Sequence, residues 1–136
     1  MNTETSEGQG VAEPDEKPWQ DVPVEYEPAW RAIFLASREG LNLSAPCPVC
    51  GVAALHQWYS LGQPEDVNLS GNRLGGLWEW CRACRSYAHY SAAVPEWWAN
   101  DLQVNPSRLA HHPTAIEQAR REREATRERT NADPAV

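Results

Sequence analysis

Cys47-Pro48-Val49-Cys50-Gly51 and, further along, Cys81-Arg82-Ala83-Cys84 hold all four cysteines of the chain and decide its fold. Thirty residues, 51–80, separate the two C-x-x-C pairs. Four thiolates can surround one Zn²⁺ ion in tetrahedral geometry, which leaves no open coordination position and makes such a site structural. The sequence therefore predicts one structural zinc ion held by Cys47, Cys50, Cys81 and Cys84.

A redox role is the alternative for the same cysteines. The chain begins Met-Asn-Thr-Glu, without the basic and apolar segments of a secretory signal, and it has no apolar run near 20 residues. We therefore expect a cytoplasmic protein, in which cysteines stay reduced. A thioredoxin-like role for Cys47 and Cys50 is the minor alternative, because no βαβ pattern surrounds them and a second C-x-x-C is present.

Charge is concentrated at the N-terminus. Residues 1–29 hold eight acidic side chains and one lysine, a net charge of −7, whereas residues 30–112 and 113–136 are each neutral. The acidic segment has few apolar residues before Trp19, so it is predicted to be a disordered arm over 1–27. The remaining core is small, and a structural metal ion is a common means of stabilising a small core.

Local patterns predict one helix and three strands around the cysteines. Pro28 suits a first helical turn, and Trp30, Ile33 and Phe34 follow at helical spacing before Gly40, which predicts a helix over 28–39 packed on the sheet. Strands are predicted over 52–60, 77–80 and 86–94. Residues 62–76 are rich in Gly, Asn and Pro and are predicted to be a loop, with some strand at 67–69.

Three short antiparallel strands with two cysteine knuckles resemble the zinc-ribbon class over residues 45–94. The resemblance implies that the four cysteines are ligands, and it implies no activity. The expected fold is small α+β, mainly β: a three-stranded antiparallel ribbon with an N-terminal helix and a charged C-terminal helix or tail. The expected organisation is an arm (1–27), a helix and connection (28–44), a ribbon (45–105) with an inserted loop (62–76), and a linker and charged helical tail (106–136).

A second resemblance concerns the residues around the second knuckle. Leu77-Trp-Glu-Trp-Cys81-x-x-Cys84-x-Ser-Tyr87, followed by Val94-Pro-Glu-Trp-Trp98, resembles small uncharacterised bacterial ribbon proteins. Some of these look like immunity proteins of toxin systems. The resemblance implies a bacterial protein whose partner is another protein, with a toxin as one candidate.

The C-terminal stretch predicts a helix that begins with a capping box. Thr114 precedes Glu117 by three residues, directly after Pro113. Residues 120–130 contain no apolar stripe, so this helix is predicted to be solvated or to fray. Its arginines suggest RNA binding, but an equal number of acidic residues offsets them over 113–136.

Aromatic residues supply the candidate binding surface. A three-stranded ribbon cannot bury all the tryptophans and tyrosines between positions 58 and 98, and such residues are enriched at binding hot spots. The predicted partner-binding residues are Trp78, Trp80, Arg82, Arg85, Tyr87, Trp97 and Trp98. The alternative is that the rings pack in the core and that the arginines balance the −2 charge of a zinc–tetrathiolate cluster.

The remaining polar residues of the strands are assigned structural roles. Alternation along the strand predicts a solvent-facing Glu79, on the face opposite Trp78 and Trp80. His56 and His89 are predicted to pair across strands or to be solvated.

No catalytic constellation is present: the sequence has no phosphate loop, no H-E-x-x-H motif and no supported Ser/His/Asp arrangement. The sequence therefore favours a zinc-binding protein-interaction module that is not an enzyme and that acts as an adaptor or immunity protein. The alternative is a nucleic-acid-associated ribbon in transcription or translation. Nucleic-acid-binding domains usually present a basic face, and this ribbon is neutral. No membrane association is expected.

Overall fold

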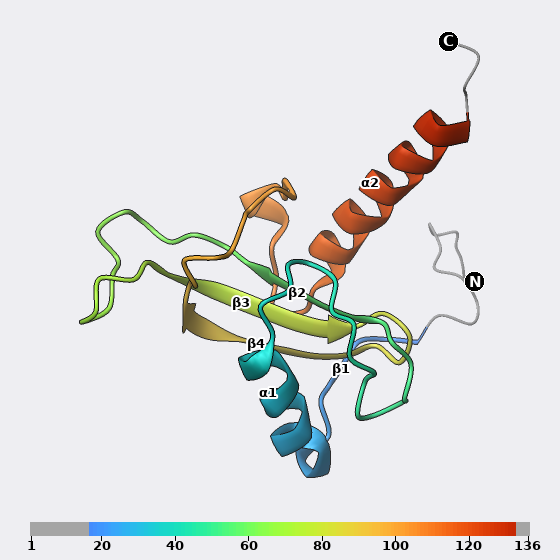
Figure 1. Cartoon of the computed structure of the whole chain (residues 1–136), viewed down its shortest axis with the longest axis horizontal. Helices are drawn as coiled ribbons and strands as arrows, with labels where there is room; N and C mark the ends of the chain where they lie inside the picture. Colours follow the sequence, from blue (N-terminus) through green and yellow to red (C-terminus); the bar gives the residue numbers. More distant parts are fainter. Residues whose placement is uncertain (1–16, 133–136) are drawn as a thin grey trace, which may run out of the picture.

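A four-stranded mixed sheet forms the centre of the protein. The computed structural model describes residues 17–132. The strands are β1 (Gln20–Asp21), β2 (Leu55–Tyr59), β3 (Leu74–Cys81) and β4 (Ser86–Ala93), and the helices are α1 (Glu27–Ala36) and α2 (Thr114–Ala132). Short 3₁₀ turns lie at Val24–Tyr26 and Pro106–Arg108. The order of the strands in the sheet is β1-β4-β3-β2, and only β1 runs parallel to its neighbour (Figure 1).

The predicted three-stranded antiparallel ribbon is therefore wrong in strand number and direction, although the α+β class is confirmed. The additional strand, β1, comes from the segment that the sequence analysis assigned to the acidic arm. The N–H of Gln20 donates to the carbonyl of Arg85 (2.9 Å), and the N–H of Val22 donates to that of Tyr87 (3.1 Å). Strand β1 has only two residues, which is too short for an alternation of apolar and polar residues, so the sequence pattern does not reveal it. Residues 1–16 of the predicted arm lie outside the described residues.

The three antiparallel strands β2, β3 and β4 are the strands that the sequence predicted, but β3 begins earlier than expected. Leu74 and the two following glycines belong to β3 and pair with β4, although the sequence placed them in the loop 62–76. A Cβ atom at Gly75 would lie 1.8 Å from the carbonyl oxygen of Ser60. This glycine thus allows a close approach of two strands and does not mark a turn. Val67 forms an isolated bridge with Arg73 across the remaining loop.

Each face of the sheet is covered by one helix. Successive residues of β3 alternate between the faces, so Leu77, Glu79 and Cys81 lie on one side and Trp78 and Trp80 on the other. Figure 1 shows α1 against the first face and the start of α2 against the second. The first core joins α1 to the cysteines through Val22, Trp30, Phe34, Leu43, Ala54 and Leu55. The second joins Trp58, Trp78, Trp80 and Tyr87 to Leu102 and Ile116.

The predicted stripe of α1 is confirmed. Trp30 and Phe34 are buried, and Ile33 packs against the same core. The helix ends at Ala36, three residues before the predicted end, because Ser37 is already extended (φ −77°, ψ 137°).

The first two turns of α2 pack on the sheet, which corrects the prediction of a solvated tail for that part. Ile116, Glu117 and Arg120 are buried, whereas most residues from 121 to 129 are exposed. The predicted capping box is also wrong: the Glu117 carboxylate accepts a hydrogen bond from the indole N–H of Trp80 (2.9 Å). The hydroxyl of Thr114 bonds His112 Nδ1 instead.

Candidate metal centre

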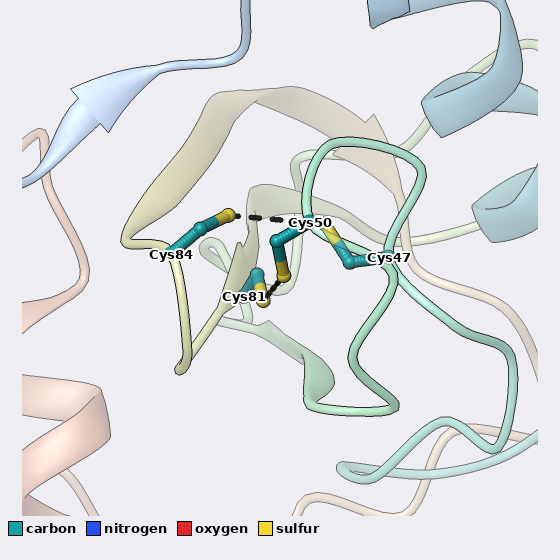
Figure 2. Close-up of side chains that lie close together, drawn as sticks. All are labelled: Cys47, Cys50, Cys81 and Cys84. Atoms are coloured by element: carbon teal, nitrogen blue, oxygen red, sulfur yellow. Dashed lines mark hydrogen bonds between the residues drawn. The ribbon is translucent and has the colours of Figure 1, made fainter.

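Two loops bring the four cysteines together at one end of the sheet. Cys47 and Cys50 lie in the loop that precedes β2, Cys81 is the last residue of β3, and Cys84 lies in the turn into β4. Cys47, Cys81 and Cys84 are buried in the core under α1, and Cys50 is exposed. Figure 2 shows the four sulfur atoms converging from the two loops.

The spacing of the sulfur atoms fits one tetrahedral metal ion. All four Sγ atoms lie within 4.8 Å of one another. The Sγ atoms of Cys47 and Cys84 are 3.8 Å apart, and those of Cys50 and Cys81 are 3.7 Å apart (Figure 2). A tetrahedral ion with metal–sulfur bonds of about 2.3 Å requires sulfur–sulfur separations of about 3.8 Å. The four cysteines therefore form a zinc-ribbon-like site that can hold one metal ion.

The two knuckles have matching backbones. The N–H of Gly51 donates to the carbonyl of Cys47 (2.7 Å), and the N–H of Arg85 donates to that of Cys81 (2.9 Å). The residue after each second cysteine has a positive φ, 82° at Gly51 and 66° at Arg85. Glycine adopts this conformation without steric cost, so the prediction for Gly51 is confirmed. Arginine adopts it at a cost of about 1 kcal/mol.

The surroundings of two of the four cysteines disfavour the thiolate form in the absence of a cation. Burial raises the pKa of Cys47 to about 11 and also raises the pKa of Cys81. These thiols would be neutral at pH 7 if no cation were bound. Thiolates are the form that ligates metals, and a bound divalent ion deprotonates a coordinating thiol. Metal binding at this site must therefore release protons.

Two of the sulfurs have hydrogen-bond partners outside the set of four cysteines. The N–H of Val49 donates to Cys47 Sγ (3.3 Å). Cys84 Sγ lies 3.3 Å from the hydroxyl oxygen of Ser86, which is fully buried. Burial acts to raise the pKa of Cys84, but its hydrogen bonds with Ser86, Cys81 and Cys47 together outweigh burial and lower the pKa. Ser86 is thus a residue of the metal centre that the sequence analysis missed, although it directly follows the knuckle.

No protein-family model, no curated protein and no solved structure matches this chain. Fold and site therefore define the class of protein directly: a small α+β protein with four cysteines positioned to hold one metal ion. None of the helices in residues 17–132 is long and apolar enough to cross a membrane.

The predicted partner-binding residues do not form one surface. Trp78, Trp80 and Tyr87 are at most 9 % exposed and belong to the second core. Trp97 and Trp98 are half-buried and contact each other edge to face.

The two knuckle arginines of the same set lie on the outside of the metal centre. Arg82 is exposed, and the guanidinium of Arg85 lies 4.3 Å from the centre of the Trp19 ring. Only Arg82, Arg85 and the two adjacent tryptophans remain candidates for a partner contact at the surface.

Glu79 is not solvent-facing, and this prediction is wrong. Its carboxylate is buried under α1, where it accepts hydrogen bonds from the indole N–H of Trp30 (3.0 Å) and the hydroxyl of Tyr90 (2.7 Å). Burial raises the pKa of Glu79, and the two hydrogen bonds act against that change. Alternation along β3 predicts one solvated sheet face, whereas helices cover both faces.

The strand histidines contact tryptophans on β3 and do not contact each other. His89 stacks on Trp78 at 4.0 Å between ring centres, and His56 lies 5.5 Å from Trp80. His56 is buried, and neither ring nitrogen has a hydrogen-bond partner among the described residues. Burial, followed by the charge of Arg120, lowers the pKa of His56 to about 4.

Proposed function

We propose that this protein is a structural zinc module whose function is to bind a partner protein in the cytoplasm, as an adaptor or as an immunity protein against a toxin. The observation that carries the proposal is the closed ligand set. Four cysteines fill all the positions of a tetrahedral ion, so no position is left to activate a water molecule or polarise a substrate. We assign zinc because an all-thiolate tetrahedral site suits it well, and we assign the cytoplasm because the cysteines must stay reduced.

Exposed apolar side chains on the long loop between β2 and β3 support partner binding. Leu69 is fully exposed at 109 %, and Leu61 and Val67 are each almost half exposed. Figure 1 shows this loop extending from the end of the sheet remote from the cysteines. Loops that project from a rigid scaffold commonly carry binding residues. The scaffold here is the sheet with its packed cores and the cluster of four cysteines.

A pull-down with full-length tagged protein from its own cells tests the proposal. Metal analysis of the purified protein should give one zinc per chain, and one protein should co-purify in stoichiometric amount after nuclease treatment. Leu69→Ser should lose that protein, whereas Ser70→Ala, a change at the neighbouring exposed position, should retain it. Recovery of ribosomal or transcription components that disappear with nuclease would support the nucleic-acid alternative. Retention of the partner by Leu69→Ser would exclude the loop as the contact.

A further inference from the structure

The outer edge of β4 is open over most of its length. On the opposite side of the sheet, residues 41–43 cover the edge of β2: the N–H of Leu43 donates to Leu55, and that of Gln57 donates to Leu41. Strand β1 pairs only with Ser86 and Tyr87 of β4. Among residues 17–132, no strand continues this pairing along the rest of β4.

The unpaired part of β4 directs main-chain groups outward. The carbonyls of Arg85 and Tyr87 point to β1, where they accept its hydrogen bonds. Main-chain groups alternate in direction along a strand, so the N–H and C=O groups of His89 and Ser91 point the same way. Natural proteins protect such edges with lysine, other charged residues or proline. The segment Ser86–Ala93 contains none of these residues.

A cavity of about 300 Å³ lies beside this edge, between β4 and α1. Three carboxylates line it, those of Asp21, Glu27 and Glu79, together with a single arginine, Arg31. Its aromatic residues are Trp30, Tyr87 and Tyr90, and two histidines, His89 and His111, complete the lining. Acidic groups beside aromatic rings favour a cationic side chain.

The chain's own Arg31 indicates how a cation fits this cavity. Its guanidinium carbon lies 5.7 Å from the centre of the Tyr90 ring, within the range of a cation–π contact. Arg31 is exposed on α1, so it can move aside for a cation that arrives from outside.

We propose that the open edge of β4 binds an extended segment of a partner protein, which adds as a further strand and places a lysine or arginine in the acidic aromatic cavity. Main-chain hydrogen bonds to His89 and Ser91 would supply affinity, and the cavity would supply specificity, as in other complexes formed by strand addition. The proposal rests on the proposed function and defines the chemistry of its partner. Charge favours a basic partner over a second copy, because each copy carries a net charge of −7.

Selection of random octapeptides displayed on phage against the full-length, zinc-loaded protein tests this proposal. We expect enriched peptides with β-branched residues at alternate positions and one required lysine or arginine. Ser91→Pro removes the outward N–H without removing a hydrogen bond to β3, and it should weaken binding of the selected peptide about 3–10-fold. The matched control Ser91→Ala should bind like wild type.

Charge variants test the cavity separately from the strand edge. Asp21→Asn combined with Glu27→Gln should weaken the selected peptide about fivefold, and Arg31→Gln should tighten it about threefold, because it removes the competing cation. Replacing the basic residue of the peptide by glutamine should abolish the difference between these variants. Far-UV circular dichroism and zinc content establish that every variant is folded.

Four outcomes would overturn the proposal: no enriched peptide, peptides without a basic residue, unchanged binding by Ser91→Pro, or a dimer in sedimentation velocity that Ser91→Pro dissociates. The last outcome would identify a second copy as the occupant. A partner found by pull-down that still binds to Ser91→Pro would remove this proposal and leave the proposed function intact. Absence of any partner in the pull-down would instead remove the proposed function.

Discussion

Replacing Glu117 by glutamine should test how α2 is held on the sheet. The carboxylate is 3 % exposed and accepts hydrogen bonds from Trp80 (2.9 Å), from two nitrogens of Arg120 (3.1 and 3.0 Å) and from Arg121 (2.8 Å). Burial acts to raise its pKa, but the hydrogen bonds from Arg120 and Trp80 and the charge of Arg120 outweigh burial and lower the pKa to about 2.

The shift in pKa sets the size of the expected effect. The pKa of Glu117 falls from 4.5 to about 2, so the charged form stabilises the folded state by about 3 kcal/mol. Because the folded pKa is lowered, this contribution is fully present above pH 4.5 and is lost as the pH falls from 4.5 to 2. Glu117→Gln removes the charge at every pH and leaves Arg120 buried without its counter-ion. A loss of this size is typical of breaking a buried ion pair.

Urea denaturation at pH 7, followed by circular dichroism on the zinc-loaded protein, measures the loss. The midpoint should fall by about 1–3 M urea, given the slopes of small proteins. Glu128→Gln, at an exposed position three turns along α2, is the control and should change the free energy of unfolding by less than about 0.5 kcal/mol. The double variant Glu117→Gln/Arg120→Gln should lose less than the two single variants together. A loss below about 1 kcal/mol for Glu117→Gln would refute the reasoning.

Three further predictions concern the metal centre and the buried polar residues. Cys81→Ser should abolish stoichiometric zinc binding and unfold the sheet, since metal binding and folding are coupled in such modules; a folded, metal-free variant by circular dichroism and metal analysis would contradict this. Because φ is positive at both sites, Gly51→Ala should lower the free energy of unfolding by about 1 kcal/mol. Arg85→Gly should raise it by about 1 kcal/mol, reduced by the energy of the lost contact with Trp19. Equal effects of the two variants in urea titrations would argue against the backbone explanation. Because the pKa of His56 is lowered to about 4, the stability that it contributes is present above pH 6.5 and is lost as the pH falls toward 4. Wild type should lose about 2 kcal/mol more than His56→Phe between pH 7 and pH 5, and parallel pH profiles in urea titrations would exclude this role.

The sequence was most informative where local chemistry determines the structure. Two C-x-x-C pairs predicted the convergence of four sulfurs, and Gly51 predicted the left-handed turn of its knuckle. The apolar stripe of α1 follows from apolar residues spaced at the helical period of 3.6. The strands β2, β3 and β4 follow from apolar spacing at a period of 2. Each C-x-x-C pair, the turn at Gly51 and the apolar periods depend on residues within a few positions of one another, and the ligand chemistry of thiolates joins the two distant pairs.

Features that depend on distant segments could not be predicted in this way. The burial of Trp78 and Trp80 depends on residues 102–120, and the stretch that precedes α2 has no periodic pattern. Glu117 matched a capping box, yet its carboxylate contacts Trp80, 37 positions earlier in the chain. The side chain of Glu79 lies on the face of β3 opposite Trp78 and Trp80, as alternation predicts. This face is covered by α1, whose Trp30 donates a hydrogen bond to Glu79, and is not open to solvent.

The candidate metal centre and the Glu117 cluster lie on opposite faces of one strand. Cys81 and Trp80 are consecutive residues of β3, and consecutive side chains in a strand point to opposite faces. The metal ligand therefore lies one peptide unit from the indole that holds α2 through Glu117. A backbone change in β3 at this point would act on both faces of the sheet. A metal ion held by the four cysteines would therefore stabilise the strand that also carries the contact with the helix on the far side.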